Sequence, residues 1–529
     1  MAAAKSTSTT KSCCRSPTGN VLAERPERMA VSPASAGEAE PGQQLLTLKR
    51  IISGPSATRT GTARCRLLST SLFNTYNRRK KMLVLRVLKK KFKSLPHVMV
   101  EGKTLKRLGN CFKQFNTWLD RKIGYLARSV MWPHVKVVPN QIMFLPFNHS
   151  VSCNMKYISE EIIRRKADVE LYWSVTSPET ASIGAQEILA RDFGTLDRKD
   201  PRVKELQEYI DQHVHFVKTN SYEYFHAAAS SKVIYINSLL GDKFYPFPTK
   251  KEQHIVQTWH GSLGIKRFDI AHYNTNMSWP VAAMRMGRLT TECISNSTFE
   301  DGVFRETFWK ETPILKLGHA RNDIFFPNYE KTRAYLRGRF IRDYDLPEDI
   351  HFALYAPTFR DNHNFAVYDL HARAVVKALS ERFGGKWCLL LRYHDNDKKN
   401  EAGKNTVRSD EVIDVTKYPD MQELLAITEV GITDYSSWIY DYVLMRRPGF
   451  IFAMDIEDYN NERGFYFKLE DTPFPVATDT SELVDHILSF NDDVYQKKVT
   501  EFLSDKGCMD DGHAQERIAD VTLQWLQKA

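Results

Sequence analysis

Short, almost continuously apolar segments recur along the chain from residue 141 onward, and helical patterns separate them. They form two series, one between residues 141 and 297 and the other between residues 352 and 454. Strands that are apolar on both faces are typical of parallel sheets covered by helices. We therefore expect an α/β fold with two doubly wound domains that face one cleft. The predicted strands are 141–147, 169–175, 232–238, 254–260, 292–297, 352–358, 387–393, 411–415, 429–433 and 449–454.

The positive charge of the chain is concentrated at its N-terminal end. The 529 residues carry a net charge of +10, but residues 1–130 hold 26 Lys and Arg against 6 Asp and Glu, which leaves residues 131–529 at −10. A protein that reads nucleic acid would carry its positive charge on the folded surface, so this pattern argues against a nucleic-acid partner. A separate basic arm favours an anionic membrane surface instead.

The arm divides into two predicted parts. Residues 1–75 lack apolar periodicity and are expected to form a disordered basic segment. Residues 76–136 are expected to form basic amphipathic helices that associate with a membrane surface. Within them, residues 78–93 hold nine Lys and Arg and no acidic residue. For residues 104–128, packing of the apolar stripe on the protein's own core remains an open alternative. Two alternatives also remain for the N-terminal end of the chain, namely a transit peptide and a working protein that starts near Met82.

Several site types are absent from the sequence. The eight cysteines form no CxxC pair, which argues against a zinc site or a disulfide framework and favours reduced thiols in the cytosol. The chain has no GxGxxG, GxxxxGK[ST], HExxH or GxSxG motif. No apolar run approaches the roughly 20 residues of a membrane-spanning helix. We therefore expect no metal, no cofactor and no membrane span.

Polar side chains gather at the carboxyl ends of the second series of strands, where open α/β sheets bind their ligands. Arg360 follows one strand, and Arg392 and His394 stand at the end of the next. Ser436 and Ser437 follow a third strand, directly before a helical stretch. Their hydroxyls and the helix N-terminus can bind phosphate oxygens, although a serine there is more often a helix cap. Together these residues favour a diphosphate site.

In the first series, the predicted strand 254–260 ends in Trp259 and His260. Gly261 follows directly, and Lys266 and Arg267 come a few residues later. A histidine before a turn is commonly a core residue, so this pattern alone leaves a structural and a functional interpretation open.

Successive motifs resemble those of the CDP-glycerol glycerophosphotransferases of teichoic acid synthesis. The resemblance covers about residues 140 to 490, in order, and leaves out the first 130. We expect no additional glycosyltransferase domain of the kind that some teichoic acid polymerases carry. The motifs are "KVIYINS", "VQTWHG", "GHARND", "YAPTFRD", "LRYHD", "DVTKYPDMQELL", "ITDYSSWIYDYVL" and "ERGFYF".

The resemblance implies a GT-B-like fold, with an acceptor domain at 137–325 and a CDP-donor domain at 326–529. It makes His260 the general base and His394 a second catalytic residue that contacts the donor phosphates. The remaining expected site residues are Thr358, Arg360, Arg392, Ser436 and Ser437 for the donor phosphates, Tyr418, Asp420, Glu423 and Asp434 for the nucleotide, and Gly261, Lys266 and Arg267 on the acceptor side. His319 and Ser262 depart from the family pattern and leave the acceptor open.

The implied reaction is transfer of glycerol phosphate from a CDP-glycerol donor to a lipid-linked polyol-phosphate acceptor, with release of CMP. It would take place at the cytoplasmic face of the plasma membrane, on a peripheral enzyme. Transfer from CDP-ribitol and a GT-B nucleotide-sugar glycosyltransferase are the near alternatives. A non-catalytic membrane or nucleic-acid binding protein that acts through the arm is an alternative of another class. The sequence leaves oligomerisation open.

Overall fold

The computed structural model describes residues 132–238, 250–262, 264, 267, 284, 286–307, 309–358, 370–393, 411–456 and 464–528. All of them belong to one compact unit, Lys91–Ala529. The predicted segment 1–75 and most of the predicted helical region 76–136 lie outside the described residues, so both stay predictions. Within the described ranges, no helix combines the length and the apolar character that crossing a bilayer requires.

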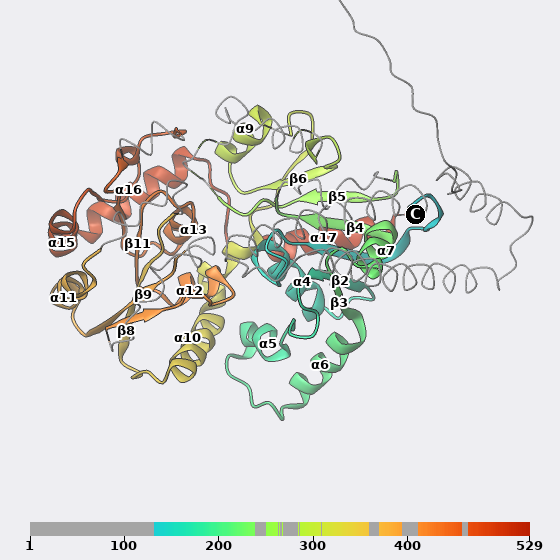
Figure 1. Ribbon diagram of the computed structural model, residues 1–529, viewed down its shortest axis with the longest axis horizontal. Helices are drawn as coiled ribbons and strands as arrows, with labels where there is room; N and C mark the ends of the chain where they lie inside the picture. Colours follow the sequence, from blue (N-terminus) through green and yellow to red (C-terminus); the bar gives the residue numbers. More distant parts are fainter. Residues whose placement is uncertain are drawn as a thin grey trace, which may run out of the picture. The chain divides into compact units, whose positions relative to one another are not determined.

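The first sheet has seven strands, and every neighbouring pair is parallel (Figure 1). Its spatial order is β3-β2-β1-β4-β5-β6-β7, so the order along the chain reverses between β1 and β4. The strands are β1 (Val138–Leu145), β2 (Glu170–Val175), β3 (Val214–Lys218), β4 (Ser231–Ile236), β5 (His254–Gln257), β6 (Glu292–Ser295) and β7 (Ile314–Lys316).

The second sheet has six strands in the order β10-β9-β8-β11-β12-β13, again all parallel. Its order reverses between β8 and β11. The strands are β8 (Ile350–Tyr355), β9 (Lys386–Leu391), β10 (Val412–Asp414), β11 (Val430–Thr433), β12 (Gly449–Phe452) and β13 (Val476–Ala477). Two parallel sheets confirm the predicted fold class.

Helices connect the strands and bury the apolar faces of the sheets, as parallel strands require. In the first half these are α4 (Cys153–Arg164), α5 (Ala185–Phe193), α6 (Pro201–His213), α7 (Tyr222–Ser230), α9 (Thr298–Glu306) and the 3-10 helices η2 (Trp132–His134) and η5 (Ala320–Phe325). The second half holds η6 (Pro327–Tyr329), α10 (Glu330–Tyr344), α11 (Ala372–Phe383), α12 (Met421–Ile427), α13 (Trp438–Tyr442), η10 (Val443–Met445), η11 (Leu469–Asp471), α15 (Thr480–Leu488), α16 (Asp492–Asp505) and α17 (Ala514–Gln527).

Each of the ten predicted strands overlaps an observed strand, whereas β3, β7 and β13 were not predicted. The predicted segments extend too far at the carboxyl end in several places. The clearest case is 254–260, because β5 already ends at Gln257 and Trp259 has a left-handed backbone with φ of 52°. His260 therefore lies in a turn beyond the strand, and the prediction that it belongs to the strand is wrong.

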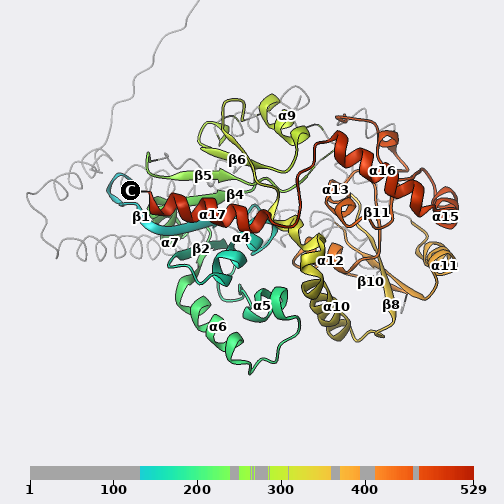
Figure 2. The same ribbon diagram turned by 180° about the vertical axis from the view of Figure 1, so that it is seen from behind.

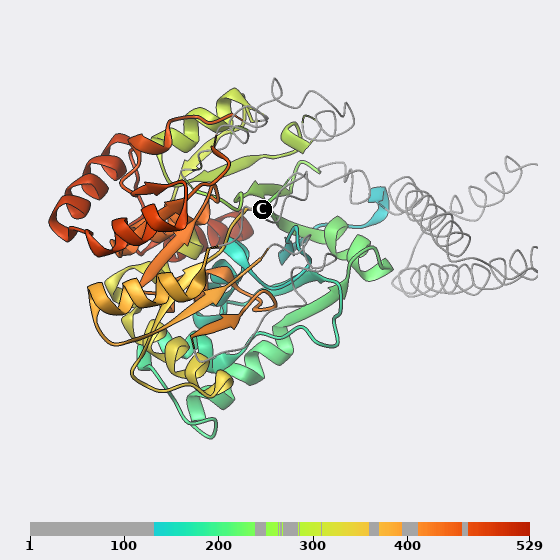
Figure 3. The same ribbon diagram turned by 60° about the vertical axis from the view of Figure 1, so that its left-hand side comes forward.

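The C-terminal helix α17 packs on the first sheet, although α15 packs on strands of the second. It contacts α4, β1 and β4, and in Figure 2 the red α17 lies beside the cyan β1 and α4. In Figure 3 the orange-red helices of the α15 and α16 region lie instead beside the orange strands of the second sheet. The ring of Trp525 stacks on His254 with centroids 4.6 Å apart. The predicted domain division at residues 325 and 326 stays a prediction.

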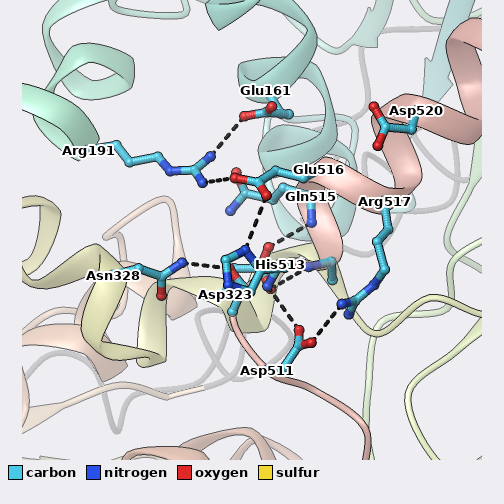
Figure 4. A network of polar contacts seen from close by, with 12 residues as sticks. Glu161, Arg191, Asp323, Asn328, Asp511, His513, Gln515, Glu516, Arg517 and Asp520 are labelled. Carbon is cyan, nitrogen blue, oxygen red and sulfur yellow. Dashed lines mark hydrogen bonds and ion pairs between the residues drawn. The ribbon is translucent and has the colours of Figure 1, made fainter.

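A buried carboxylate fixes the start of α17 (Figure 4). Asp323, which is fully buried in η5, accepts hydrogen bonds from the backbone N–H groups of Ala514 and Gln515 at 3.0 and 2.7 Å. The first N–H groups of a helix have no partner within the helix, and Asp323 supplies one from a distant segment. Nearby, Arg191 forms ion pairs with Glu161 of α4 and Glu516 of α17.

We expect Asp323→Ala to lower the free energy of unfolding by about 2 kcal/mol or more, because it leaves two buried N–H groups without an acceptor. Urea unfolding followed by circular dichroism measures this change. Asp520→Ala is the matched control, since this carboxylate on α17 is 59% exposed and its ion pair with Arg165 should contribute at most about 1 kcal/mol. Equal losses in the two variants would contradict the capping role.

Candidate functional site

A cavity of about 290 Å³ lies at the carboxyl ends of strands from both sheets. It is lined by segments that follow β1 and β5 of the first sheet and β8, β9 and β11 of the second. In each sheet, at least one of these segments follows a strand at which the strand order reverses, namely β1 in the first sheet and β8 and β11 in the second. Open α/β sheets bind ligands at such reversals. The cavity is lined by Phe147, Asn148, Ser152, Cys153, His260, Arg321, Ala356, Pro357, Arg392, Tyr393, Pro419, Asp420, Met421, Gln422, Ser436, Ser437, Trp438 and Asp441.

A strained turn after β5 directs His260 into this cavity. The left-handed backbone of Trp259 costs roughly 1–3 kcal/mol, and such strain persists only where the surroundings enforce it. The Trp259 N–H donates to Oε1 of Gln257 at 2.9 Å. From α4, Nδ2 of Asn154 donates to the carbonyl oxygen of Thr258 at 3.0 Å. These two contacts hold the turn in one conformation.

The tautomer of His260 follows from its hydrogen bond. Its Nδ1 lies 2.5 Å from the carbonyl oxygen of Asn237, and because a carbonyl can only accept, Nδ1 carries the proton. The Nε2 lone pair is then available. Burial lowers the pKa of His260 to about 4, and the nearby Arg321 guanidinium acts in the same direction, against the hydrogen bond to Asn237. His260 is therefore neutral at pH 7 and able to accept a proton.

We expect the ring of His260 to titrate with a midpoint near pH 4, against about 6.5 for an unperturbed histidine. Nitrogen-15 NMR of the ligand-free protein should show the Nδ1-protonated tautomer throughout the neutral range. His260→Gln identifies the resonance. A midpoint near 6.5, or a proton on Nε2, would contradict this assignment.

A buried ion pair joins the two halves of the cavity. Nη1 of Arg321, from η5, donates to the carbonyl oxygen of His260 at 2.7 Å, and Nη2 donates to Oδ2 of Asp441 in α13 at 2.6 Å. The two charged side chains are only 7% and 1% exposed. Although burial opposes it, the Asp441 carboxylate raises the pKa of Arg321. Neither Arg321 nor Asp441 was among the predicted site residues, although they lie in the motifs GHARND and ITDYSSWIYDYVL.

The turn after β5 also lies close to Ser437, one of the two predicted phosphate-binding serines. Ser437 is the N-cap residue of α13, yet its side chain forms no capping hydrogen bond. A Cβ atom at Gly261 would lie 3.3 Å from Oγ of Ser437, so the glycine allows the two segments to approach closely. Ser436 and Ser437 both line the cavity with His260. The hydroxyl of Ser437 is thus not used for capping.

Three further predicted residues stand at the ends of the neighbouring strands β9, β8 and β11: Arg392 and Thr358 for the donor phosphates and Asp434 for the nucleotide. Arg392 lines the cavity and donates from Nη1 to the carbonyl oxygen of Tyr418 at 2.6 Å. Asp434 is buried, and its carboxylate accepts from the N–H of Thr358 at 2.8 and 3.0 Å. Thr358 and Asp434 do not line the cavity. They fix the backbone where β8 and β11 end.

Of the other predicted nucleotide residues, Glu423 and Asp420 contact Lys156 of the first half of the fold, and Tyr418 binds Glu423. Glu423 is almost fully buried and binds the Lys156 ammonium, the Arg339 guanidinium and the hydroxyl of Tyr418. Although burial opposes it, Lys156 and Arg339 lower the pKa of Glu423. Asp420 accepts from Lys156 at 3.1 Å and is the one member of this group that lines the cavity.

The remaining predicted residues are placed elsewhere or not described. His394, Arg360 and Lys266 lie outside the described residues. Arg267 donates its N–H to the carbonyl oxygen of Gly464 at 3.2 Å, and its guanidinium lies 5.5 Å from the ring centroid of Tyr466. It does not line the cavity. In the part of the chain that the structure describes, no three His, Cys, Asp or Glu side chains form a group that could hold a metal ion.

Solved structures support the same architecture. The wall teichoic acid polymerase TagF superposes with a TM-score of 0.61 and 26% identity, over 79% of this chain and 98% of that one. A variant of TagF has also been determined after a soak with CDPG. The GT-B-like architecture expected from the motifs is therefore confirmed.

Curated relatives are enzymes of teichoic acid synthesis. The teichoic acid poly(glycerol phosphate) polymerase of Staphylococcus epidermidis is 28% identical over 406 residues, which cover 69% of this chain and 54% of that polymerase. The teichoic acid ribitol-phosphate primase of Bacillus spizizenii is 29% identical over 296 residues, which cover 54% of this chain and 75% of the primase. The chain thus spans about half the length of the polymerase. The profile of the CDP-glycerol:poly(glycerophosphate) glycerophosphotransferase family matches residues 127–524, and the chain belongs to this family.

Proposed function

We propose that this protein transfers glycerol phosphate from CDP-glycerol to a hydroxyl group of a lipid-linked teichoic acid acceptor and releases CMP. The proposal rests on two features of one cavity. His260 is neutral with an available Nε2 lone pair, and hydroxyl and guanidinium groups line the same cavity. A base and an anion-binding wall are the two requirements of phosphoryl transfer to a hydroxyl. Membership of the family supports the same reaction.

In the proposed step, the acceptor hydroxyl gives its proton to Nε2 of His260, and its oxygen forms a bond to the phosphorus that carries glycerol. The bond from this phosphorus to the oxygen of CMP breaks, and CMP leaves with the electron pair. Ser436, Ser437 and Arg392 stabilise the charge on the diphosphate by hydrogen bonding. Arg360 and His394 belong to the same proposed donor site by their place in the motifs.

The donor is tested by incubating the protein with CDP-glycerol, CDP-ribitol and UDP-sugars and by following the release of CMP or UDP. We expect CMP from CDP-glycerol. Release of CMP from CDP-ribitol but not from CDP-glycerol would replace glycerol by ribitol in the proposed reaction. The ribitol-phosphate primase among the relatives suggests this alternative. UDP release would replace the proposed reaction by glycosyl transfer.

Removal of the base should slow turnover. We expect His260→Ala to lower kcat by about 10² or more while donor affinity stays nearly unchanged, because proton transfer contributes at that scale. The matched control is His254→Ala, since His254 stands at the start of β5, pairs with Glu292 and does not line the cavity. Wild-type turnover in His260→Ala would remove this residue from the mechanism.

Removal of the two hydroxyls should weaken donor binding. We expect the double variant Ser436→Ala with Ser437→Ala to bind CDP-glycerol at least about tenfold more weakly, because hydrogen bonds to a charged ligand contribute about 1.5–3 kcal/mol. Isothermal calorimetry measures the affinity. Ser489→Ala, at the exposed end of α15, provides the control. Unchanged affinity would show that the donor diphosphate binds elsewhere.

We also propose that the protein works at the cytoplasmic face of the plasma membrane through its basic arm. The support is compositional, because nine Lys and Arg without an acidic residue occupy residues 78–93. Cations near an anionic leaflet contribute about 1 kcal/mol each.

A further inference from the structure

One exposed aromatic ring stands at the cavity beside His260. Phe147 follows β1, is 49% exposed and lines the cavity. Its ring centroid lies 4.9 Å from that of His260. A single exposed apolar side chain needs no explanation in itself, but this one is held in a fixed relation to the proposed base.

Asn237 holds both residues. It is fully buried directly after β4, the strand beside β1 and β5. Its Oδ1 accepts from the N–H of Phe147 at 3.0 Å, and its main-chain oxygen accepts from Nδ1 of His260 at 2.5 Å. One buried residue therefore connects the backbone of Phe147 to the imidazole of His260.

The cavity lining from the first sheet combines polar side chains, such as those of Asn148, Ser152 and Arg321, with the phenyl ring of Phe147. The wall from the second sheet offers hydroxyl and guanidinium groups at Ser436, Ser437 and Arg392, which suit a diphosphate. The ring of Phe147, on the wall from the first sheet, offers only carbon atoms. A hydroxyl that donates to Nε2 of His260 must lie within about 3.2 Å of it, which brings the carbon chain bearing that hydroxyl close to the ring.

We propose that Phe147 binds the acceptor by packing its ring against the terminal polyol carbon chain, and that Asn237 is the positioning residue that keeps this ring in register with His260. The inference rests on the proposed function and deepens it, because it assigns the acceptor to the wall from the first sheet. Apolar contact contributes to binding in proportion to the area that it removes from water.

The test uses the full chain, CDP-glycerol and a short soluble acceptor that ends in glycerol phosphate. We expect Phe147→Ala to raise the acceptor KM about tenfold while the donor KM changes less than twofold, because a buried aromatic contact contributes on this scale. Phe147→Tyr keeps the ring and should restore the acceptor KM. Phe193→Ala is the matched control, because Phe193 is 45% exposed and does not line the cavity.

Asn237 is tested by a double-mutant cycle on the acceptor KM. If Asn237 acts through Phe147, then Asn237→Ala raises the acceptor KM, and the double variant is no worse than Phe147→Ala alone. Additive losses would assign Asn237 a general structural role instead. Thermal unfolding monitors whether each variant remains folded.

The outcomes separate this inference from the proposed function. An unchanged acceptor KM in Phe147→Ala, with an active wild type, overturns the acceptor assignment alone. Binding of the acceptor without donor, measured by calorimetry, gives an independent readout. A wild type that binds the acceptor through Phe147 but releases no CMP would count against the reaction and not against the acceptor wall.

Discussion

The ion pair between Arg321 and Asp441 is the interaction on which the cavity depends. Burying an isolated charge costs several kcal/mol, so two such groups remain buried only when they are paired and their other hydrogen bonds are satisfied. Asp441 also accepts from Ser262 at 2.8 Å and from Gln422 at 3.2 Å, and Arg321 also binds the carbonyl of His260. The pair thereby ties the turn of the first sheet to α13 of the second.

A second cluster of charged side chains, centred on Glu423 of α12, also links the two halves of the fold. Lys156 of α4 and Arg339 of α10 both bind Glu423, and Lys156 also reaches Asp420 at 3.1 Å. Because Tyr418 donates to the same carboxylate, its hydroxyl is used within the protein. These contacts hold the segment that presents Asp420 to the cavity. Side chains that the motifs associate with the nucleotide thus also hold the two sheets together.

The sequence predicted the fold well because most strands are short, almost continuously apolar runs with helical patterns between them. The strands that it missed are those with a weak signal. Val214–Lys218 contains His215 and ends in lysine, Ile314–Lys316 has three residues and Val476–Ala477 has two. The gathering of Arg392, Ser436 and Ser437 at one cavity follows from the shared edge at which the parallel strands of the second sheet end, whereas His260 comes from the first sheet.

By itself, the sequence determined the two parallel sheets and the edge at which polar residues collect, because both follow from local apolar patterns and strand direction. Only the tertiary structure decided which groups lie beside the proposed base. Asn237 and Phe147 are 90 residues apart in the chain, and Arg321 and Asp441 are 120 apart. No local pattern records such pairings, because the neighbours of a side chain at the cavity are set by strand order and by the packing of distant segments. The tautomer and the low pKa of His260 arise from that packing.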